Sequence, residues 1–315
     1  MSQASMERVE FESHGVALVG QRFRGEGNAF ATGTDSAGQS GARPCVIIAH
    51  GFGNTADSGL FQFGEAFASI GLDALVFDYR CFGESAGEPR QLVSYKRHRE
   101  DYHSAIAFAR TLDGVDPERI ALWGTSYSGG HVIAVAAADH RVAAVISVVA
   151  SLDGAATLKQ LVKTAGAGQL AKATARGMQD RLAALAGRKP VMMATAAVPG
   201  ELAALSTPDA LPGVLEIAGP TYVNEFCARE ALVASNNRPI KLAKKVECPV
   251  LFQIAVDDQI APNESVEKAA EEMGAQAEMR RYPGGHFDAY RGDTCAEIKA
   301  DEMAFLQRVF SGSGS

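Results

Sequence analysis

One short stretch of the sequence places a serine between small residues, a spacing that can produce a nucleophile. Ser126 lies between Gly124 and Ser128, directly after an apolar run that predicts a strand and directly before a pattern typical of a helix. A strand can reverse into a helix within about one residue only if the flanking positions are small. Such a turn, a nucleophile elbow, would hold the Ser126 hydroxyl above the sheet. The backbone N–H of Tyr127 would point into the same space from the start of the helix.

A second frame centres the turn on Ser128, with Ser126 and Gly130 as its small flanks. In that frame the nucleophile would lie well past Gly124, the last glycine of the strand, so we favour Ser126. An ordinary loop of glycine and serine between a strand and a helix is the non-catalytic alternative.

A serine hydroxyl is a poor nucleophile at neutral pH, so it needs a base, and the base needs an orienting carboxylate. After a serine elbow of this kind the acid and then the histidine follow along the chain. His286 is the last histidine of the sequence, in a Pro-Gly-Gly-His loop after the final predicted strand. Its small neighbours would let the loop bring the imidazole back over the sheet. The alternative is a histidine on a surface loop.

Three carboxylates are candidates for orienting that base. Asp257 and Asp258 follow the predicted strand 250–254, and Asp153 follows the preceding predicted strand. One of the adjacent pair could orient the base while the other caps the next helix, and spacing alone does not separate them. The loop of Asp153 also opens at the carboxyl end of the sheet, where ligands of such folds bind.

Acyl transfer also needs two hydrogen-bond donors for the negative charge that develops on the substrate oxygen. The Tyr127 N–H is the first predicted donor. The second is the N–H of Phe52, in a loop that follows the predicted strand 45–49. Glycines flank Phe52 on both sides, so its backbone can approach a substrate closely.

The elements that must position these residues alternate between strands and helices. Apolar runs predict five strands, at residues 45–49, 74–77, 119–125, 142–149 and 250–254, and a final strand is predicted at about 277–282. Helical periodicity lies between most of them, which predicts an α/β fold with a mostly parallel twisted sheet and helices on both faces. Before the first of these strands, residues 7–23 predict a β-hairpin and residues 24–43 predict a surface loop.

The regular alternation stops at about residue 151. The following stretch is rich in alanine, helix-prone and interrupted by glycine and proline, which predicts an inserted helical cap over the site. We therefore expect a core formed by residues 1–150 and 241–310, a cap at 151–240 and a flexible tail at 311–315. Within the cap, Tyr222 and Phe226 are predicted to bind the substrate by lining an acyl pocket; plain core packing is the alternative.

The composition, 47% hydrophobic and 21% charged, is typical of a globular protein. The net charge of −7 argues against nucleic acid as a partner. Charge is uneven, because residues 155–189 contain seven basic residues and a single acid. This segment could attract anionic substrates, although a solvated helix face is the simpler interpretation.

The remaining features predict a cytoplasmic protein. The five cysteines are widely spaced and show no metal-type pairing, so we expect free thiols. We find no secretory leader and no apolar run near the ~18 residues that a membrane span requires, so no membrane partner is expected. The predicted chemistry needs no cofactor and no metal. The sequence leaves the oligomeric state open, with a homodimer as one option.

Together, five motifs resemble those of the α/β-hydrolase superfamily: His50-Gly51-Phe52-Gly53, Asp78-Tyr79-Arg80, the elbow Gly124 to Gly130, Asp258-Gln259-Ile260-Ala261-Pro262 and Tyr282 to Phe287. Within it, the chain is similar to the bacterial esterase and S15-peptidase-like branch. The acid loop of that family maps onto Asp258. The resemblance thus implies the α/β-hydrolase fold and the triad Ser126, Asp258 and His286, but no particular substrate.

The predicted function is a serine hydrolase that cleaves a carboxylic ester, or a related acyl bond, of a small-molecule substrate through an acyl-enzyme on Ser126. The same triad could serve an acyltransferase or a thioesterase. A third alternative is a ligand-binding protein that keeps the fold without catalysis. Relatives that displace halogen or open epoxides carry aspartate at the elbow, so the serine argues against those reactions.

Overall fold

The computed structural model describes residues 5–34 and 40–312. Its main sheet contains β1 (Met6–Ser13), β2 (Val16–Phe23), β3 (Thr32–Thr34), β4 (Ser40–Ala49), β5 (Asp73–Phe77), β6 (Val115–Thr125), β7 (Val142–Val148), β11 (Val250–Ala255) and β12 (Ala277–Tyr282). The strand order is β1-β2-β5-β4-β6-β7-β11-β12, and β3 pairs with β4. Strands β5 to β12 of this order run parallel, whereas β1 and β2 are antiparallel to their neighbours. The predicted mostly parallel sheet is confirmed.

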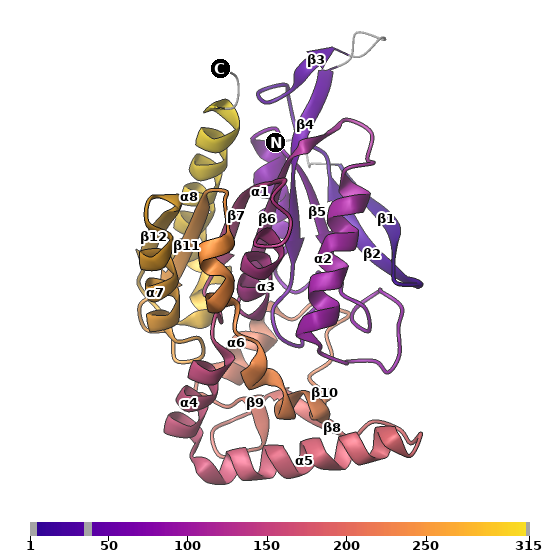
Figure 1. The fold of residues 1–315 in the computed structure, drawn as a ribbon, viewed down its shortest axis with the longest axis vertical. Helices are drawn as coiled ribbons and strands as arrows, with labels where there is room; N and C mark the ends of the chain where they lie inside the picture. Colours follow the sequence, from indigo (N-terminus) through magenta and orange to yellow (C-terminus); the bar gives the residue numbers. More distant parts are fainter. Residues whose placement is uncertain (1–4, 35–39, 313–315) are drawn as a thin grey trace.

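Helices cover both faces of the sheet (Figure 1). One face carries α2 (Tyr95–Ala109), α3 (Tyr127–Ala136) and α7 (Asn263–Met273), and the other carries α1 (Phe61–Ser69) and α8 (Gly292–Ser311). Crossover helices of this kind are what parallel neighbours require, because a tight hairpin can join only antiparallel strands.

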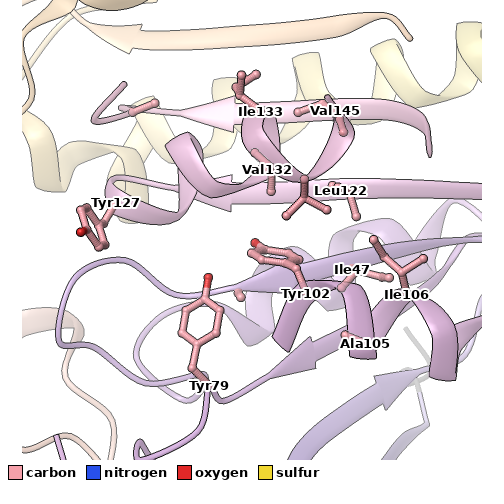
Figure 2. Packing of buried hydrophobic residues seen from close by; sticks show 14 of the residues in the cluster. Ile47, Tyr79, Tyr102, Ala105, Ile106, Leu122, Tyr127, Val132, Ile133 and Val145 are labelled. Carbon is pink, nitrogen blue, oxygen red and sulfur yellow. The ribbon is translucent and has the colours of Figure 1, made fainter. Parts of the chain in front are cut away.

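The strands are apolar at consecutive positions because the helices bury both faces. In β4, Ile47 packs into the cluster under α2 and α3, whereas Val46 and Ile48 pack into the cluster under α1 and α8. Figure 2 shows the first cluster, in which Leu122 of β6 and Val132 of α3 lie close together. Alternate residues of a strand point to opposite faces of the sheet, and both faces are buried here. Strands such as β4 are therefore apolar at consecutive positions.

The predicted hairpin is confirmed by the antiparallel pairing of β1 with β2. The predicted surface loop at residues 24–43 is wrong in part, because β3 and the start of β4 form an antiparallel pair within it, and residues 35–39 lie outside the described residues. Strand β4 begins before its apolar run, since the Arg43 N–H donates to the carbonyl of Gly114 next to β6. Such pairing is held by backbone groups and leaves no hydrophobic pattern.

Residues 149–249, which we call the connecting segment, join β7 to β11. They form α4 (Gly154–Ala165), α5 (Ala167–Leu185), α6 (Ala210–Ile217), three short strands and three 3-10 helices. The strands β8 (Met192–Ala196), β9 (Ala203–Leu205) and β10 (Phe226–Cys227) form a second sheet in the order β10-β8-β9. Figure 1 shows α5 lying across the end of the molecule opposite the two chain termini.

The segment predicted to be a helical cap thus contains helices, but also the strands β8, β9 and β10, which the sequence analysis missed. These strands are two to five residues long and rich in alanine, which has a weak preference for strands. A buried carboxylate on α5 supports them: Asp180 accepts the N–H of Val191 and forms an ion pair with Arg229 at 2.6 Å. The predicted tail also begins later than residue 311, because α8 extends through Ser311; residues 313–315 lie outside the described residues.

Candidate active site

The elbow between β6 and α3 holds Ser126 in an unusual backbone conformation. Its φ of 56° and ψ of −119° are strained for a residue with a side chain, and such strain is typical of functional turns. Three backbone hydrogen bonds fix it: Ser126 N–H donates to Val148, and its carbonyl accepts from Gly129 and Ser151. A Cβ on Gly124 would lie 2.4 Å from the Ser128 carbonyl oxygen, so the small residue predicted there is required by close packing.

Ser128 does not share the position of Ser126. It is fully buried, and its Oγ lies 2.9 Å from the Tyr79 hydroxyl and 2.7 Å from the Tyr102 hydroxyl. Tyr102 also donates to the carbonyl of Trp123 at 2.8 Å. Figure 2 shows Tyr79 and Tyr102 beneath the elbow, next to the core. Ser128 is therefore part of a buried hydroxyl cluster that ties α2 to the elbow.

His286 and Asp258 complete a chain of hydrogen bonds that begins at Ser126. His286 Nε2 lies 3.0 Å from Ser126 Oγ, and His286 Nδ1 lies 2.7 Å from Asp258 Oδ2. The Asp258 side chain is inaccessible to solvent, and its Oδ1 accepts the backbone N–H groups of Ile260 and Ala261 at 2.8 and 2.9 Å. A carboxylate can only accept, so it stabilises the tautomer in which Nδ1 carries the proton and Nε2 is free to accept the serine proton.

The loop that carries His286 has its own support, which sequence reasoning missed. Asp288 Oδ2 accepts the backbone N–H of Gly285 at 2.8 Å, and Gly284 has a φ of 99° in the region that favours glycine. A Cβ on Gly284 would lie 2.5 Å from Asp288 Oδ2. Gly284 is thus the residue that lets this tight turn present the imidazole.

The other two carboxylates considered from the sequence lie elsewhere. Asp257 is exposed, and its backbone N–H donates to Gly284. Asp153 is the N-cap of α4 and forms a salt bridge with Arg238 at 2.7 Å, so it holds the start of the connecting segment. Of the three, the structure brings only Asp258 to His286.

The two predicted oxyanion donors lie beside the nucleophile. Tyr127 is the first residue of α3, and a Cβ on Gly51, next to Phe52, would lie 3.0 Å from Ser126 Cβ. Within the described residues, the backbone N–H groups of Phe52 and Tyr127 have no hydrogen-bond acceptor in the protein. Two free donors next to a serine hydroxyl are the arrangement that stabilises a tetrahedral oxyanion.

A cavity of about 160 Å³ opens onto Ser126. Its lining comes from the elbow, from Phe52, from the acid loop and above all from the connecting segment. The main apolar residues that line it are Leu158, Leu161, Leu170, Met193 and Phe226. A mostly apolar cavity beside a nucleophile fits an acyl chain.

The two predicted substrate-binding residues have different positions. Phe226 lines the cavity and packs edge-on against Phe52, with ring centroids 4.9 Å apart. Tyr222 is not among the lining residues; its hydroxyl donates to Asn224 at 3.0 Å and its ring packs near α6. The structure therefore does not bring Tyr222 to the lining of this cavity. Residues four positions apart face the same way in a regular helix or strand, and residues 222–225 form neither.

Glu230 is a cavity residue that sequence reasoning missed. It lies on the 3-10 helix η1 (Ala228–Leu232), is 3% exposed, and accepts a hydrogen bond from the Tyr127 hydroxyl at 3.0 Å. Burial raises the pKa of Glu230 to about 8, although the hydrogen bond from Tyr127 lowers that pKa in part. No local pattern around this residue marks it, since its burial arises only when η1 packs against α5.

The remaining buried histidines near the elbow are poor candidates for a base. Burial lowers the pKa of His50 to about 4 and those of His98 and His131 well below the usual histidine value. No hydrogen bond joins any of them to Ser126 among the described residues. The imidazole in contact with Ser126 is that of His286.

Neither a metal centre nor a membrane span is found among the described residues. In residues 5–34 and 40–312, the His, Cys, Asp and Glu side chains form no group of three or more that could hold a metal ion. Across the same residues, no helix combines the length and the apolar character needed to cross a bilayer. All five cysteines are free thiols, and four of them are buried.

The fold and the site together define the class of this protein. A family model described as the alpha/beta hydrolase fold matches residues 44–293, and the chain belongs to that family. The match spans the elbow, the acid loop and the histidine loop as well as the connecting segment.

The chain is also similar in sequence or structure to several individual proteins. It is 37% identical over 270 residues to the quorum-quenching protein AidA of Acinetobacter baumannii, which covers 85% of this chain and 87% of that protein. It is 37% identical over 147 residues to the thiohydrolase aneE of Aspergillus aculeatus, covering 46% of this chain and 42% of that protein. The solved structure of the α/β hydrolase GrgF from Penicillium sp. sh18 shares the fold, with a TM-score of 0.78 at 24% identity over 98% of this chain and 99% of that one.

Proposed function

We propose that this protein is a serine hydrolase that cleaves carboxylic esters through an acyl-enzyme on Ser126. The observation that carries the proposal is the unbroken chain of contacts Ser126 Oγ to His286 Nε2 at 3.0 Å and His286 Nδ1 to Asp258 Oδ2 at 2.7 Å. This arrangement gives a serine, a base and an orienting carboxylate at the distances that nucleophilic catalysis needs.

In the proposed reaction His286 Nε2 takes the proton of Ser126 as Oγ forms a bond to the acyl carbon. The carbonyl oxygen becomes an oxyanion and accepts hydrogen bonds from the N–H groups of Phe52 and Tyr127. The imidazolium then gives its proton to the leaving alkoxide as the ester C–O bond breaks. Water, deprotonated by His286, then attacks the acyl carbon of the acyl-enzyme. The bond between this carbon and Ser126 Oγ breaks, Oγ regains the proton from His286, and the carboxylic acid leaves.

Asp258 acts on this cycle through the imidazole. Its charge stabilises the imidazolium that forms twice in each turnover, and its hydrogen bond keeps Nδ1 protonated. The two backbone donors from Ile260 and Ala261 hold the carboxylate in place, so His286 is oriented before the substrate arrives.

We propose that the connecting segment is the cap that selects the acyl group. Residues of α4, α5, β8, β9 and η1 line most of the cavity beside Ser126. The core around the main sheet would then supply the chemistry, and the connecting segment would supply the acyl specificity. Placement of the chain in the bacterial esterase and S15-peptidase-like branch stays a prediction.

Hydrolysis of a thioester is the second candidate reaction. It is favoured by the similarity over about half of this chain to a protein named a thiohydrolase. The geometry supports both reactions, because the same oxyanion forms and only the leaving atom differs. Transfer of the acyl group to an alcohol or amine would also begin with the same acyl-enzyme.

The test is hydrolysis of p-nitrophenyl esters with acyl chains from two to twelve carbons, by wild type and by the matched variants Ser126→Ala and Ser128→Ala. We expect only Ser126→Ala to lose at least about 10³-fold in kcat/KM, since it removes the nucleophile. The parallel assay with acyl thioesters decides the leaving group, and added alcohol or amine reveals transfer. A wild type that cleaves none of these substrates would contradict the proposal.

A further inference from the structure

The cavity beside Ser126 contains one acidic side chain among its lining residues in the described part of the chain. Leucine, alanine, methionine and phenylalanine supply half of the lining residues and serine, threonine and glutamine most of the rest, and Glu230 lies among them. The reaction proposed above uses Ser126, His286, Asp258 and two backbone N–H groups, so it assigns no role to this carboxyl group.

Glu230 has no cationic partner among the residues that the structure describes. The described residues place no lysine, arginine or histidine nitrogen within ion-pair distance of it. Arg229, its neighbour along the chain, is paired with Asp180 at 2.6 Å, and Arg99 donates to Asn237. A buried carboxyl without a cation is unfavourable as an anion, so it is stable at neutral pH mainly as the protonated acid.

One carboxyl oxygen is occupied and the other is available. Glu230 Oε1 accepts from the Tyr127 hydroxyl at 3.0 Å, whereas no described residue forms a hydrogen bond with Oε2. Oε2 is not completely shielded from solvent, and Glu230 lines the cavity, so this oxygen is open to a hydrogen bond from outside the protein. A side chain needed only for packing would leave no such polar atom in an apolar cavity.

Glu230 is placed to contact the acyl chain of a substrate rather than the bond that is cleaved. Its hydrogen-bond partner is the side chain of Tyr127, whose backbone N–H is beside the nucleophile, so the tyrosine side chain separates Glu230 from the oxyanion donors. Glu230 and Ser126 nevertheless line the same cavity. An acyl group attached to Ser126 and extending into this cavity would therefore pass the carboxyl group.

We propose that Glu230 is a specificity-determining residue, whose carboxyl group hydrogen-bonds to an oxygen atom carried on the acyl chain, so that the preferred substrates are esters of hydroxy or keto acids rather than of plain fatty acids. The inference rests on the proposed function and names its substrate class. A protonated carboxyl donates to a ketone or a hydroxyl and still accepts from Tyr127, so both carboxyl oxygens would be satisfied in the complex. With an unsubstituted chain Oε2 would lose its contact with water and gain nothing.

The experiment compares kcat/KM for p-nitrophenyl octanoate with its 3-hydroxy, 5-oxo, 7-oxo and 8-amino derivatives. The proteins are wild type, Glu230→Leu, Glu230→Gln and the control Glu201→Leu, which removes an exposed acidic side chain of the connecting segment that does not line the cavity. For wild type we expect at least one oxygenated ester to exceed octanoate by about ten-fold, the discrimination that one well-placed hydrogen bond gives.

In Glu230→Leu the preference should fall to near one, whereas Glu230→Gln, which can still donate and accept, and the control Glu201→Leu should keep it. An unchanged preference in a folded Glu230→Leu variant overturns the proposal, as does a preference of wild type for the amino ester. If Glu230→Leu does not fold, the wild-type series still decides, because a wild type that prefers no oxygenated ester overturns the proposal.

Labelling with a fluorophosphonate separates this failure from a failure of the proposed function. A protein that is labelled at Ser126 but shows no preference for oxygenated chains is a serine hydrolase with a different acyl specificity. A protein that is neither labelled nor active on any ester fails the proposed function itself.

Discussion

Replacing Asp258 by asparagine is expected to remove most of the esterase activity while leaving the fold in place. The two side chains have nearly the same shape, so the substitution changes chemistry rather than packing. Oδ1 of Asp258 accepts two backbone N–H groups, from Ile260 and Ala261. These donors would hold the oxygen of asparagine on their side and turn its NH₂ group toward His286 Nδ1.

The size of the effect follows from the tautomer of His286. Facing an NH₂ donor instead of a carboxylate, Nδ1 must act as an acceptor, so the proton moves to Nε2, the atom 3.0 Å from Ser126 Oγ. Nε2 can then no longer take the serine proton. An equivalent change in a serine protease lowers kcat about 10⁴-fold, which corresponds to about 5 kcal/mol in the barrier. Since both backbone donors keep their acceptor, we expect a change of only about 1 kcal/mol in the free energy of unfolding.

The assay is kcat on the best p-nitrophenyl ester, with urea unfolding measured on the same preparations. Asp257→Asn is the matched control, because Asp257 is the exposed neighbour on the same loop. It should keep activity within about twofold of wild type, as surface substitutions usually do. The reasoning is refuted if Asp258→Asn stays within tenfold of wild type, or if Asp257→Asn is the variant that loses activity.

Three further predictions concern the elbow and the core beneath it. Ser128→Ala should keep activity within about tenfold but lose about 1 to 3 kcal/mol of stability in urea unfolding, because the Tyr79 and Tyr102 hydroxyls lose a partner; an inactive but fully stable variant would contradict this. Gly124→Ala should give little folded protein by circular dichroism, since its Cβ would lie 2.4 Å from a backbone oxygen, and wild-type yield and melting temperature would refute that clash. Burial raises the pKa of Glu302 to about 8 from 4.5, so between these values the folded chain keeps a proton that the unfolded chain has lost, and the stability contributed by Glu302 falls as pH rises. The free energy of unfolding of Glu302→Gln should therefore rise relative to that of wild type as the pH is raised from 5 to 8. A stability difference that does not change with pH would contradict this prediction.

The sheet could be predicted because burial on both faces leaves a continuous apolar run, as in β4 around Ile47. The strands that were not predicted have no such continuous apolar run. Strands β3, β8, β9 and β10 are two to five residues long, and backbone pairing or contact with a neighbouring helix holds them. Their formation depends on tertiary packing, which a local pattern does not encode.

Some residues of the site could likewise be predicted from local sequence patterns, whereas others could not. Ser126 and His286 are marked locally, because the elbow and the histidine loop need small residues at fixed positions. Asp257 and Asp258 could not be separated by spacing, since the choice depends on which side chain the turn at Ile260 directs inward, and only the family resemblance favoured Asp258. Glu230 carries no local mark at all, as its burial results from contacts between η1, α5 and the elbow.

The measurement that tests the central claim most directly is labelling with a fluorophosphonate, followed by peptide mass spectrometry on wild type, Ser126→Ala and Ser128→Ala. The account predicts one phosphonyl group on wild type, attached to Ser126, the same modification on Ser128→Ala, and none on Ser126→Ala. A label on Ser128 would contradict the assignment of the nucleophile, and a wild type that takes up no label would contradict serine catalysis at this site.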